Sequence, residues 1–232
     1  MTSETTTEVA AGEAWVRLAG EGSDRSIDAY ELFSARRALR LIKDELGRER
    51  LLALLADEVA AGTAFLRENV ERSAGRTASG TTTLRAHGLS AAQFTGWLAR
   101  AFAREDVMIA GHPEHYSIHA EPGRHVNIVE TLGEHVCSFF MREWDDSLVG
   151  EQDAAAAAGA ATEGRRSHLL LEDGTVVGSI ANAFEEEPDG FTARLSVTLP
   201  ATCGAEVVEQ HLEHFAVEFR SWILRAAAEV AG

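Results

Sequence analysis

The first half of the chain carries apolar residues at helical spacing. Spacings of three and four residues over 26–47, and again over 48–72, predict two consecutive helices that could form a helical hairpin. Asp28 is suited to begin the first helix and Gly47 to end it. The Gly/Thr/Ser-rich stretch 73–87 that follows is predicted to be a loop with at most one short strand.

A third helix is expected over 91–104. Ser90 is a favourable N-cap, and Gln93 occupies the position that completes a capping box. The apolar residues that follow recur at the spacing of one buried helix face. The buried face is predicted to be made by Phe94, Trp97, Leu98, Ala101 and Phe102.

After this helix the apolar period changes from 3.6 to 2, which is typical of strands. The turns between the extended segments are rich in Gly, Pro and Asp. A long amphipathic helix is then predicted from Gly204 to Val230, with an apolar stripe that must lie on the sheet. The six predicted strands are 116–120, 124–132, 134–144, 167–172, 175–184 and 191–199.

This order of elements predicts an α+β protein with a helix-grip fold. In such a fold a curved antiparallel sheet wraps a long C-terminal helix and leaves a pocket between them. Residues 1–25 are expected to be a flexible N-terminal leader and 26–232 a single domain. Within that domain we expect a helical hairpin at 26–73, the sheet and C-terminal helix at 89–232, and a flexible Ala-rich loop at 150–165.

Composition excludes several classes of partner. The chain has 21 Lys and Arg against 37 Asp and Glu, a formal charge of −16, so its mean field repels nucleic acid and anionic membranes. No apolar run approaches the roughly 20 residues of a membrane span, and the first residues do not resemble a signal peptide. Cys137 and Cys203 form neither a zinc-type spacing nor a disulfide framework, so a cytoplasmic location is expected.

Histidines cluster around one predicted strand hairpin. Five of the nine histidines lie between residues 112 and 135. If the turn at Pro122 and Gly123 pairs its flanking residues, His115 lies opposite Glu130 and His119 opposite Val126. His115, His119 and Glu130 would then share one face of the sheet, although such a hairpin could equally be a half-exposed surface without a ligand.

The last helix offers a second pair of donor groups. His214 and Glu218 are four residues apart and are therefore neighbours on one helix surface. Together with His115 and Glu130 they would supply two imidazoles and two carboxylates, which suit zinc or another divalent transition metal. The plainer interpretation is that this pair lies on a solvated helix face, where such spacing is common.

Two segments carry a resemblance to a known family. The helix start Leu89-Ser-Ala-Ala-Gln-Phe-Thr-Gly-Trp97 followed by Gly111-His112-Pro113-Glu114-His115-Tyr116 resembles the helix-then-HPxxH arrangement of the diacetylphloroglucinol and phloretin hydrolases. The C-terminal stretch from His214 to Glu218 resembles the helix on which that family carries a His and a Glu four apart. Family members have a helix-grip fold of the Bet v 1 and START type, hold zinc, and cleave a carbon–carbon bond between an acyl group and a phenolic ring.

The resemblance implies a role for each matched residue. His214 and Glu218 would be the metal ligands on the helix, Glu130 the ligand on the strand, and His115 or His112 the first histidine ligand. A remaining histidine, His119 or His112, could deliver the proton to the departing ring. The pocket for the aromatic part of the substrate is expected to be shaped by Phe139, Met141, Phe184 and Leu195.

Three hypotheses for the function therefore stand beside one another, and the sequence leaves open whether the protein is an enzyme. The first is a zinc-dependent hydrolase acting on acylphloroglucinol-like substrates. The second is a metal-free helix-grip module that binds a hydrophobic or aromatic small molecule. The third is an assembly protein whose helical hairpin forms a homodimer. Common nucleotide, serine-hydrolase and calcium motifs do not occur in a suitable context.

Overall fold

The computed structural model describes residues 25–120, 125–145, 148 and 165–231. The predicted leader and Ala-rich loop therefore lie almost wholly outside the described residues. The chain divides into two compact units, Met1–Ile42 and Lys43–Gly232. The described part of the first unit is the beginning of helix α1, and the second unit contains every other described element.

The helices differ from the predicted ones mainly at their ends. Helix α1 spans Arg25–Leu54 and contains a kink at Gly47, whose φ of 66° is readily adopted only by glycine. The predicted helix end at Gly47 is confirmed, because the backbone of Gly47 is not helical and a second helical stretch begins after it. That second stretch was predicted to continue to residue 72 but is interrupted at Leu55, before α2 begins. The capping box of Ser90 and Gln93 is confirmed at the start of α3. The other helices are α2 (Ala56–Ser73), α3 (Ala91–Ala101), the short α4 (Glu105–Ile109) and α6 (Ala205–Ala231).

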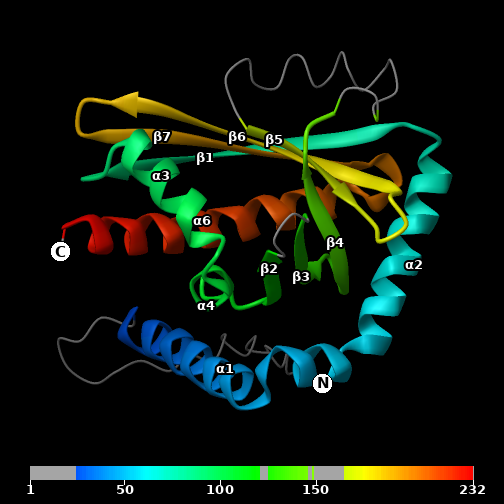
Figure 1. Cartoon of the computed structure of the whole chain (residues 1–232), viewed down its shortest axis with the longest axis horizontal. Helices are drawn as coiled ribbons and strands as arrows, with labels where there is room; N and C mark the ends of the chain where they lie inside the picture. Colours follow the sequence, from blue (N-terminus) through cyan, green and yellow to red (C-terminus); the bar gives the residue numbers. More distant parts are fainter. Residues whose placement is uncertain (1–24, 121–124, 146–147, 149–164, 232) are drawn as a thin grey trace, which may run out of the picture. The chain divides into compact units, whose positions relative to one another are not determined.

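Seven strands form one antiparallel sheet in the described chain, where six were predicted. Their order is β1-β7-β6-β5-β4-β3-β2, so β1 and β2 are the two edges (Figure 1). Neighbours in sequence pair directly except for β1, which joins the far side of β7. The strands are β1 (Thr77–His87), β2 (His115–Ala120), β3 (Val126–Leu132), β4 (His135–Glu143), β5 (Arg165–Leu170), β6 (Val176–Glu187) and β7 (Gly190–Pro200).

The predicted loop at 73–87 is wrong, because most of it is the long edge strand β1. The strand pairs with β7 over its whole length, from Thr77 opposite Pro200 to His87 opposite Gly190. Its Thr and Ser side chains form hydroxyl hydrogen bonds across to β7. On the other face Gly80 lies under helix α6, where a Cβ atom would come within 2.7 Å of a leucine side chain. The composition that suggests a loop therefore belongs to a strand with one polar face.

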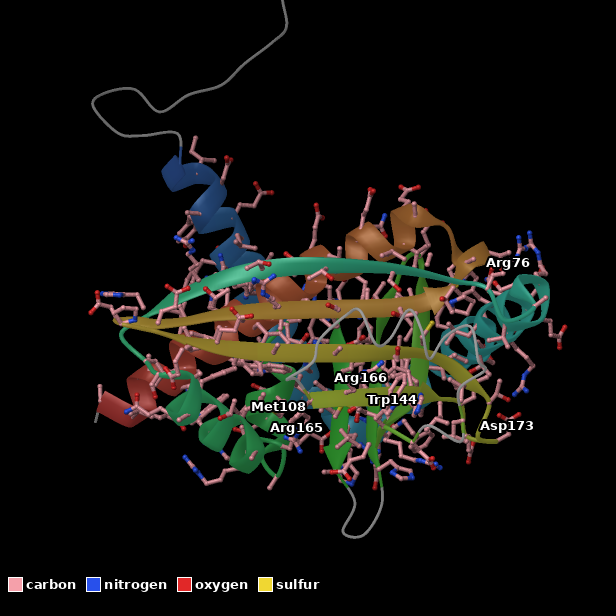
Figure 2. All side chains as sticks on the ribbon, turned by 90° about the horizontal axis from the view of Figure 1, so that it is seen from above. Arg76, Met108, Trp144, Arg165, Arg166 and Asp173 are labelled. Carbon is pink, nitrogen blue, oxygen red and sulfur yellow. The ribbon has the colours of Figure 1, made fainter. Side chains whose placement is uncertain are left out.

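Helix α6 packs on the inner face of the curved sheet, and the main core lies between them. In Figure 2 the long ribbons of β1, β7 and β6 run side by side in front of this helix. Phe94 of α3 joins the core through ring contacts with Phe184, Phe191 and Phe219. The predicted α+β helix-grip fold is confirmed. None of the helices in the described part of the chain combines the length and apolarity needed to span a membrane.

Candidate metal centre

The two predicted donor pairs meet at one place in the fold. His115 begins β2 and lies opposite Glu130 of β3, as the sequence predicted. His214 and Glu218 lie on the face of α6 that is turned toward these strands, and all four side chains are buried. The strand pair and the helix are far apart in sequence, so these four side chains become buried only when α6 packs on the sheet.

The distances within this cluster fit a single metal ion. The Nε2 atoms of His115 and His214 are 2.9 Å apart, and Glu130 Oε2 is 3.4 and 3.5 Å from them, respectively. Glu218 Oε1 lies 3.9 Å from His115 Nε2. Donor atoms held at 2.0–2.1 Å around one tetrahedral zinc ion are about 3.3 Å apart. The four side chains could therefore hold such an ion with small adjustments.

A neighbouring hydrogen bond fixes which nitrogen of His115 is available. His115 Nδ1 is 3.2 Å from the carbonyl oxygen of Met108, and since a carbonyl only accepts, Nδ1 carries the proton. The same oxygen also accepts a hydrogen bond from Trp222 Nε1 at 3.3 Å. The lone pair of His115 therefore sits on Nε2, toward the cluster. A metal-binding histidine commonly donates its other N–H to a carbonyl in this way.

Burial drives the groups of this cluster toward their neutral forms. It lowers the pKa of His115 to about 3 and raises the pKa of Glu130 to about 8. The pKa of Glu218 is also raised and that of His214 lowered, again chiefly by burial. Although His115 and Glu130 are close enough for an ion pair, loss of hydration outweighs their attraction. A divalent cation suits this environment, because it binds neutral imidazoles and stabilises ionised carboxylates.

The prediction that His119 shares a face with His115 and Glu130 is wrong. The pairing shifts between His115 and Ser117, so that His119 lies opposite Asn127 rather than Val126. A β-bulge inserts one residue, and one residue reverses the face of every side chain that follows. His119 Nδ1 instead lies 3.0 Å from Glu105 Oε2 of α4.

His112 lies beside the cluster but is poorly suited to bind a metal in its present orientation. Its ring stacks on that of His214, with centroids 3.7 Å apart. Its Nδ1 accepts a hydrogen bond from the backbone N–H of Glu114, so the proton of the neutral ring is on Nε2. His112, Glu114 and His214 do lie close enough to be a ligand group. The geometry favours His115 over His112 as the first histidine ligand.

A large cavity opens between the sheet and α6, and the two carboxylates of the cluster lie at its floor. Its volume is about 1180 Å³, and Glu130 and Glu218 form part of its wall. Of the predicted pocket residues, Phe139, Met141 and Phe184 line the cavity, whereas Leu195 is fully buried in the core. Among the described residues that form the wall, none is a predicted site histidine, since the wall does not include His112, His115, His119 or His214. The remaining apolar wall includes Ile118, Ile128, Ile180, Phe215, Phe219 and Trp222.

The predicted site residues do not include His211. Its ring is buried, packs on Phe215 and lines the cavity. Its Nε2 lies 4.0 Å from Glu130 Oε1, and its Nδ1 has no hydrogen-bond partner in the described structure. Burial lowers the pKa of His211 to about 4. Its spacing of three residues from His214 places both on one helix face, and this signal could have identified it.

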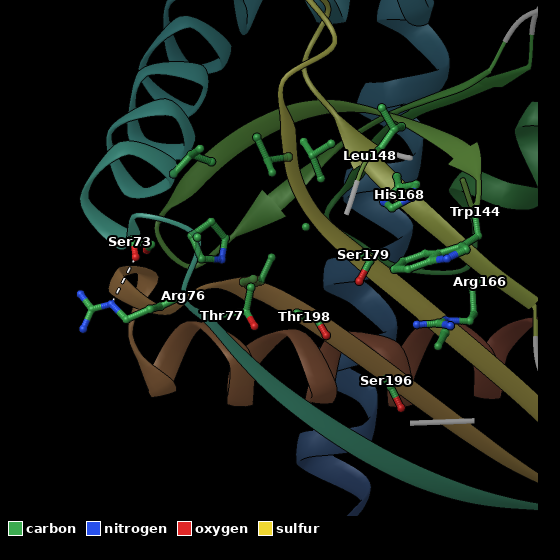
Figure 3. A pocket seen from close by; sticks show the side chains of 18 residues that line it. Ser73, Arg76, Thr77, Trp144, Leu148, Arg166, His168, Ser179, Ser196 and Thr198 are labelled. Carbon is green, nitrogen blue, oxygen red and sulfur yellow. Dashed lines mark hydrogen bonds between the residues drawn. The ribbon is translucent and has the colours of Figure 1, made fainter. Parts of the chain in front are cut away.

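A smaller hollow of about 180 Å³ lies on the outer face of the sheet (Figure 3). Its residues on the strands, such as His168 and Thr198, alternate with residues that face the core. The indole of Trp144 lies between His168, on which it stacks, and the guanidinium of Arg166. The sheet separates this hollow from the histidine and glutamate cluster.

Comparisons with known proteins give neighbours in structure but not in sequence. No protein-family model matches the chain, and no curated protein matches it. The solved structure of Ara h 8.0201 is similar at 10% identity and a TM-score of 0.44, covering 66% of this chain and 99% of that one.

Two further structures belong to di-domain proteins. The di-domain ARO/CYC BexL from the BE-7585A biosynthetic pathway gives 16% identity and a TM-score of 0.39, covering 76% of this chain. The di-domain ARO/CYC StfQ from the steffimycin biosynthetic pathway gives 13% identity and a TM-score of 0.39, covering 91% of this chain. The matches span 59% of BexL and 61% of StfQ.

Proposed function

We propose that this protein binds an apolar, aromatic small molecule in the cavity between the sheet and α6. The volume of about 1180 Å³ and the predominance of aliphatic and aromatic side chains in the wall support this. Rings such as that of Phe139 could pack on a flat ligand, and polar side chains of the wall, such as Arg142 and Asn182, could bind its polar substituents. The buried carboxylates at the floor give the ligand a defined orientation.

We further propose that His115, Glu130, His214 and Glu218 hold a divalent transition metal, most readily zinc, at that floor. The observation that carries this proposal is that His115 Nε2 lies 2.9–3.9 Å from donor atoms of the other three residues, in a buried cluster whose two carboxylates line the cavity. Metal binding would also relieve the unfavourable burial of two carboxylates. The reaction we propose is hydrolysis of a carbon–carbon bond between an acyl group and a phenolic ring.

In this reaction water adds to the acyl carbonyl carbon, the bond to the ring breaks, and the ring carbon takes up a proton. A bound zinc ion would supply an activated water and polarise the carbonyl oxygen. The chain's own groups bind and orient the substrate: the aromatic wall holds the ring, and His211 offers a ring nitrogen beside Glu130. The products are a carboxylic acid and the parent phenol.

Metal analysis of the purified protein tests the proposal. After removal of metals and reconstitution with zinc, we expect about one equivalent per chain in the wild type and in His119→Asn, a matched control on the same strand. His115→Asn and the double variant His214→Ala/Glu218→Gln should lose most of it. Less than a tenth of an equivalent in the wild type would refute the metal centre. Incubation with an acylated phenol, followed by detection of the free phenol, then tests the reaction.

A metal-free binding module is the second candidate. The apolar character of most of the cavity wall favours it, because such a wall binds a hydrophobic ligand without any metal. In that case the double variant His214→Ala/Glu218→Gln would retain the wild-type affinity for an aromatic ligand, and no acylated phenol would be consumed. A wild-type protein that binds zinc and turns over an acylated phenol would exclude this candidate.

A further inference from the structure

The second half of helix α1 reaches the backbone beside the candidate metal centre. Lys43 Nζ donates hydrogen bonds to the carbonyl oxygens of Pro113 and His115, both at 2.6 Å. The side chain is partly buried, and its ammonium lies 5.3 Å from the ring centre of Tyr116. One side chain therefore binds a peptide group before His115, the first histidine of the cluster, and the peptide group directly after it.

Arg48 holds the same strand on the other side of the bulge. Its Nε donates to Ser117 Oγ at 3.0 Å and lies 3.4 Å from Glu105 Oε1. Ser117 Oγ in turn donates to Glu105 at 3.1 Å. The register shift falls between His115 and Ser117. Lys43 and Arg48 therefore bind the strand immediately before and after the shift.

A bulge needs such support. The extra residue interrupts the ladder of backbone hydrogen bonds, and a carbonyl without a partner would leave the peptide group free to reorient. The side chain of His115 is carried by this irregular backbone, and its Nε2 must stay within ligand distance of His214 and Glu130. A shift of about 1 Å in a supporting group is enough to disturb a metal or catalytic site.

The charge of Lys43 and its hydrogen bonds have opposite effects on metal affinity. A positive group near His115 disfavours a cation bound at Nε2, as its effect on the His115 imidazole already indicates. Loss of the charge alone would therefore tighten metal binding, whereas loss of the two hydrogen bonds would weaken it. The two roles predict changes of opposite sign.

We propose that Lys43 is a positioning residue of the metal centre, whose two hydrogen bonds to the carbonyl oxygens of Pro113 and His115 hold the His115 imidazole at ligand distance. This inference rests on the proposed metal centre and gives the N-terminal helix a role in it. Supporting residues around a metal site typically contribute 10- to 100-fold in metal affinity.

The test is zinc affinity, measured by competition with a coloured chelator, for the wild type, Lys43→Met, Lys43→Arg and Arg67→Met. Lys43→Met should bind zinc about 10- to 100-fold more weakly. Lys43→Arg keeps the charge and several donors and should recover most of the affinity. Arg67→Met, on α2, removes an equal charge from an exposed ion pair with Asp173 and should bind as the wild type does. Circular dichroism of each metal-free protein ensures that affinities are compared between folded chains.

Equal or tighter zinc binding by Lys43→Met would overturn the inference, because charge would then outweigh positioning. A loss in Lys43→Arg as large as that in Lys43→Met would also overturn it. Absence of zinc binding by the wild type is a different result, which refutes the metal centre itself and this inference with it.

Discussion

Gly62 of α2 lies directly against the carbonyl oxygen of Val136 in β4, so that a Cβ atom at position 62 would overlap that oxygen. We expect Gly62→Ala to lower the free energy of unfolding by about 2–4 kcal/mol, because neither backbone can move away easily. Urea denaturation measures the change. Gly96→Ala on α3 is the matched control, since its Cβ would meet only the end of the Arg100 side chain, at 3.6 Å, and should raise stability by up to about 1 kcal/mol.

The pKa of Glu130 predicts a pH dependence of the zinc-free protein. Burial raises this pKa from 4.5 to about 8, so the native state keeps a proton that the unfolded chain releases. The contribution of Glu130 to stability is therefore intact below pH 4.5 and declines as the pH rises toward about 8. Glu130→Gln stays neutral, so its stability relative to the wild type should increase by about 1–3 kcal/mol between pH 6 and pH 8. Denaturation with a chelator present tests this, and a constant difference would contradict it.

Filling the cavity should separate ligand binding from metal binding. Met141 lines the cavity, and its partners on the neighbouring strands are Val126 and Leu169. We expect Met141→Trp to weaken binding of an apolar fluorescent probe by about tenfold or more, while zinc stoichiometry stays unchanged. Thr83→Trp adds the same ring to the outer face of β1 and should leave probe affinity unaltered. If both variants bind the probe equally, the probe does not occupy this cavity.

The two cysteines should be unreactive in the native protein. Both are buried, and burial raises the pKa of Cys137 to about 12 and of Cys203 to about 11. At pH 8 we expect labelling by an aromatic disulfide reagent to be slower than in denaturant by a factor on the order of 100 or more. The colour released over time measures this. Rapid labelling of Cys137 without denaturant would show that the packing of α2 on β4 opens readily.

The long periodic elements could be predicted from the sequence, and so could the meeting of two donor pairs. Alternation along β3 and β4 marks those strands, and the spacing of His214 and Glu218 identifies one helix surface. The position of His115 opposite Glu130 follows from a simple count across the hairpin. The turn residues used for that count, 121–124, lie outside the described residues. The pairing of β2 with β3 nevertheless places His115 opposite Glu130.

What could not be predicted depends on tertiary packing. No residue type marks the bulge after His115, so the count across the hairpin fails by one at His119. The edge strand β1 reads as a loop because its Thr and Ser side chains find hydroxyl partners only on β7. The five residues of α4 are too few for a periodic signal, although they supply the Met108 carbonyl that orients His115.

The wide separation in sequence between the strand donors and the α6 donors has a consequence for biosynthesis. His115 and Glu130 are translated well before His214 and Glu218, with four more strands between them. A nascent chain that stops before α6 has only half of the donor set, and its sheet lacks the helix that covers it. Acquisition of a metal ion at this centre would therefore be a late event that reports completed maturation.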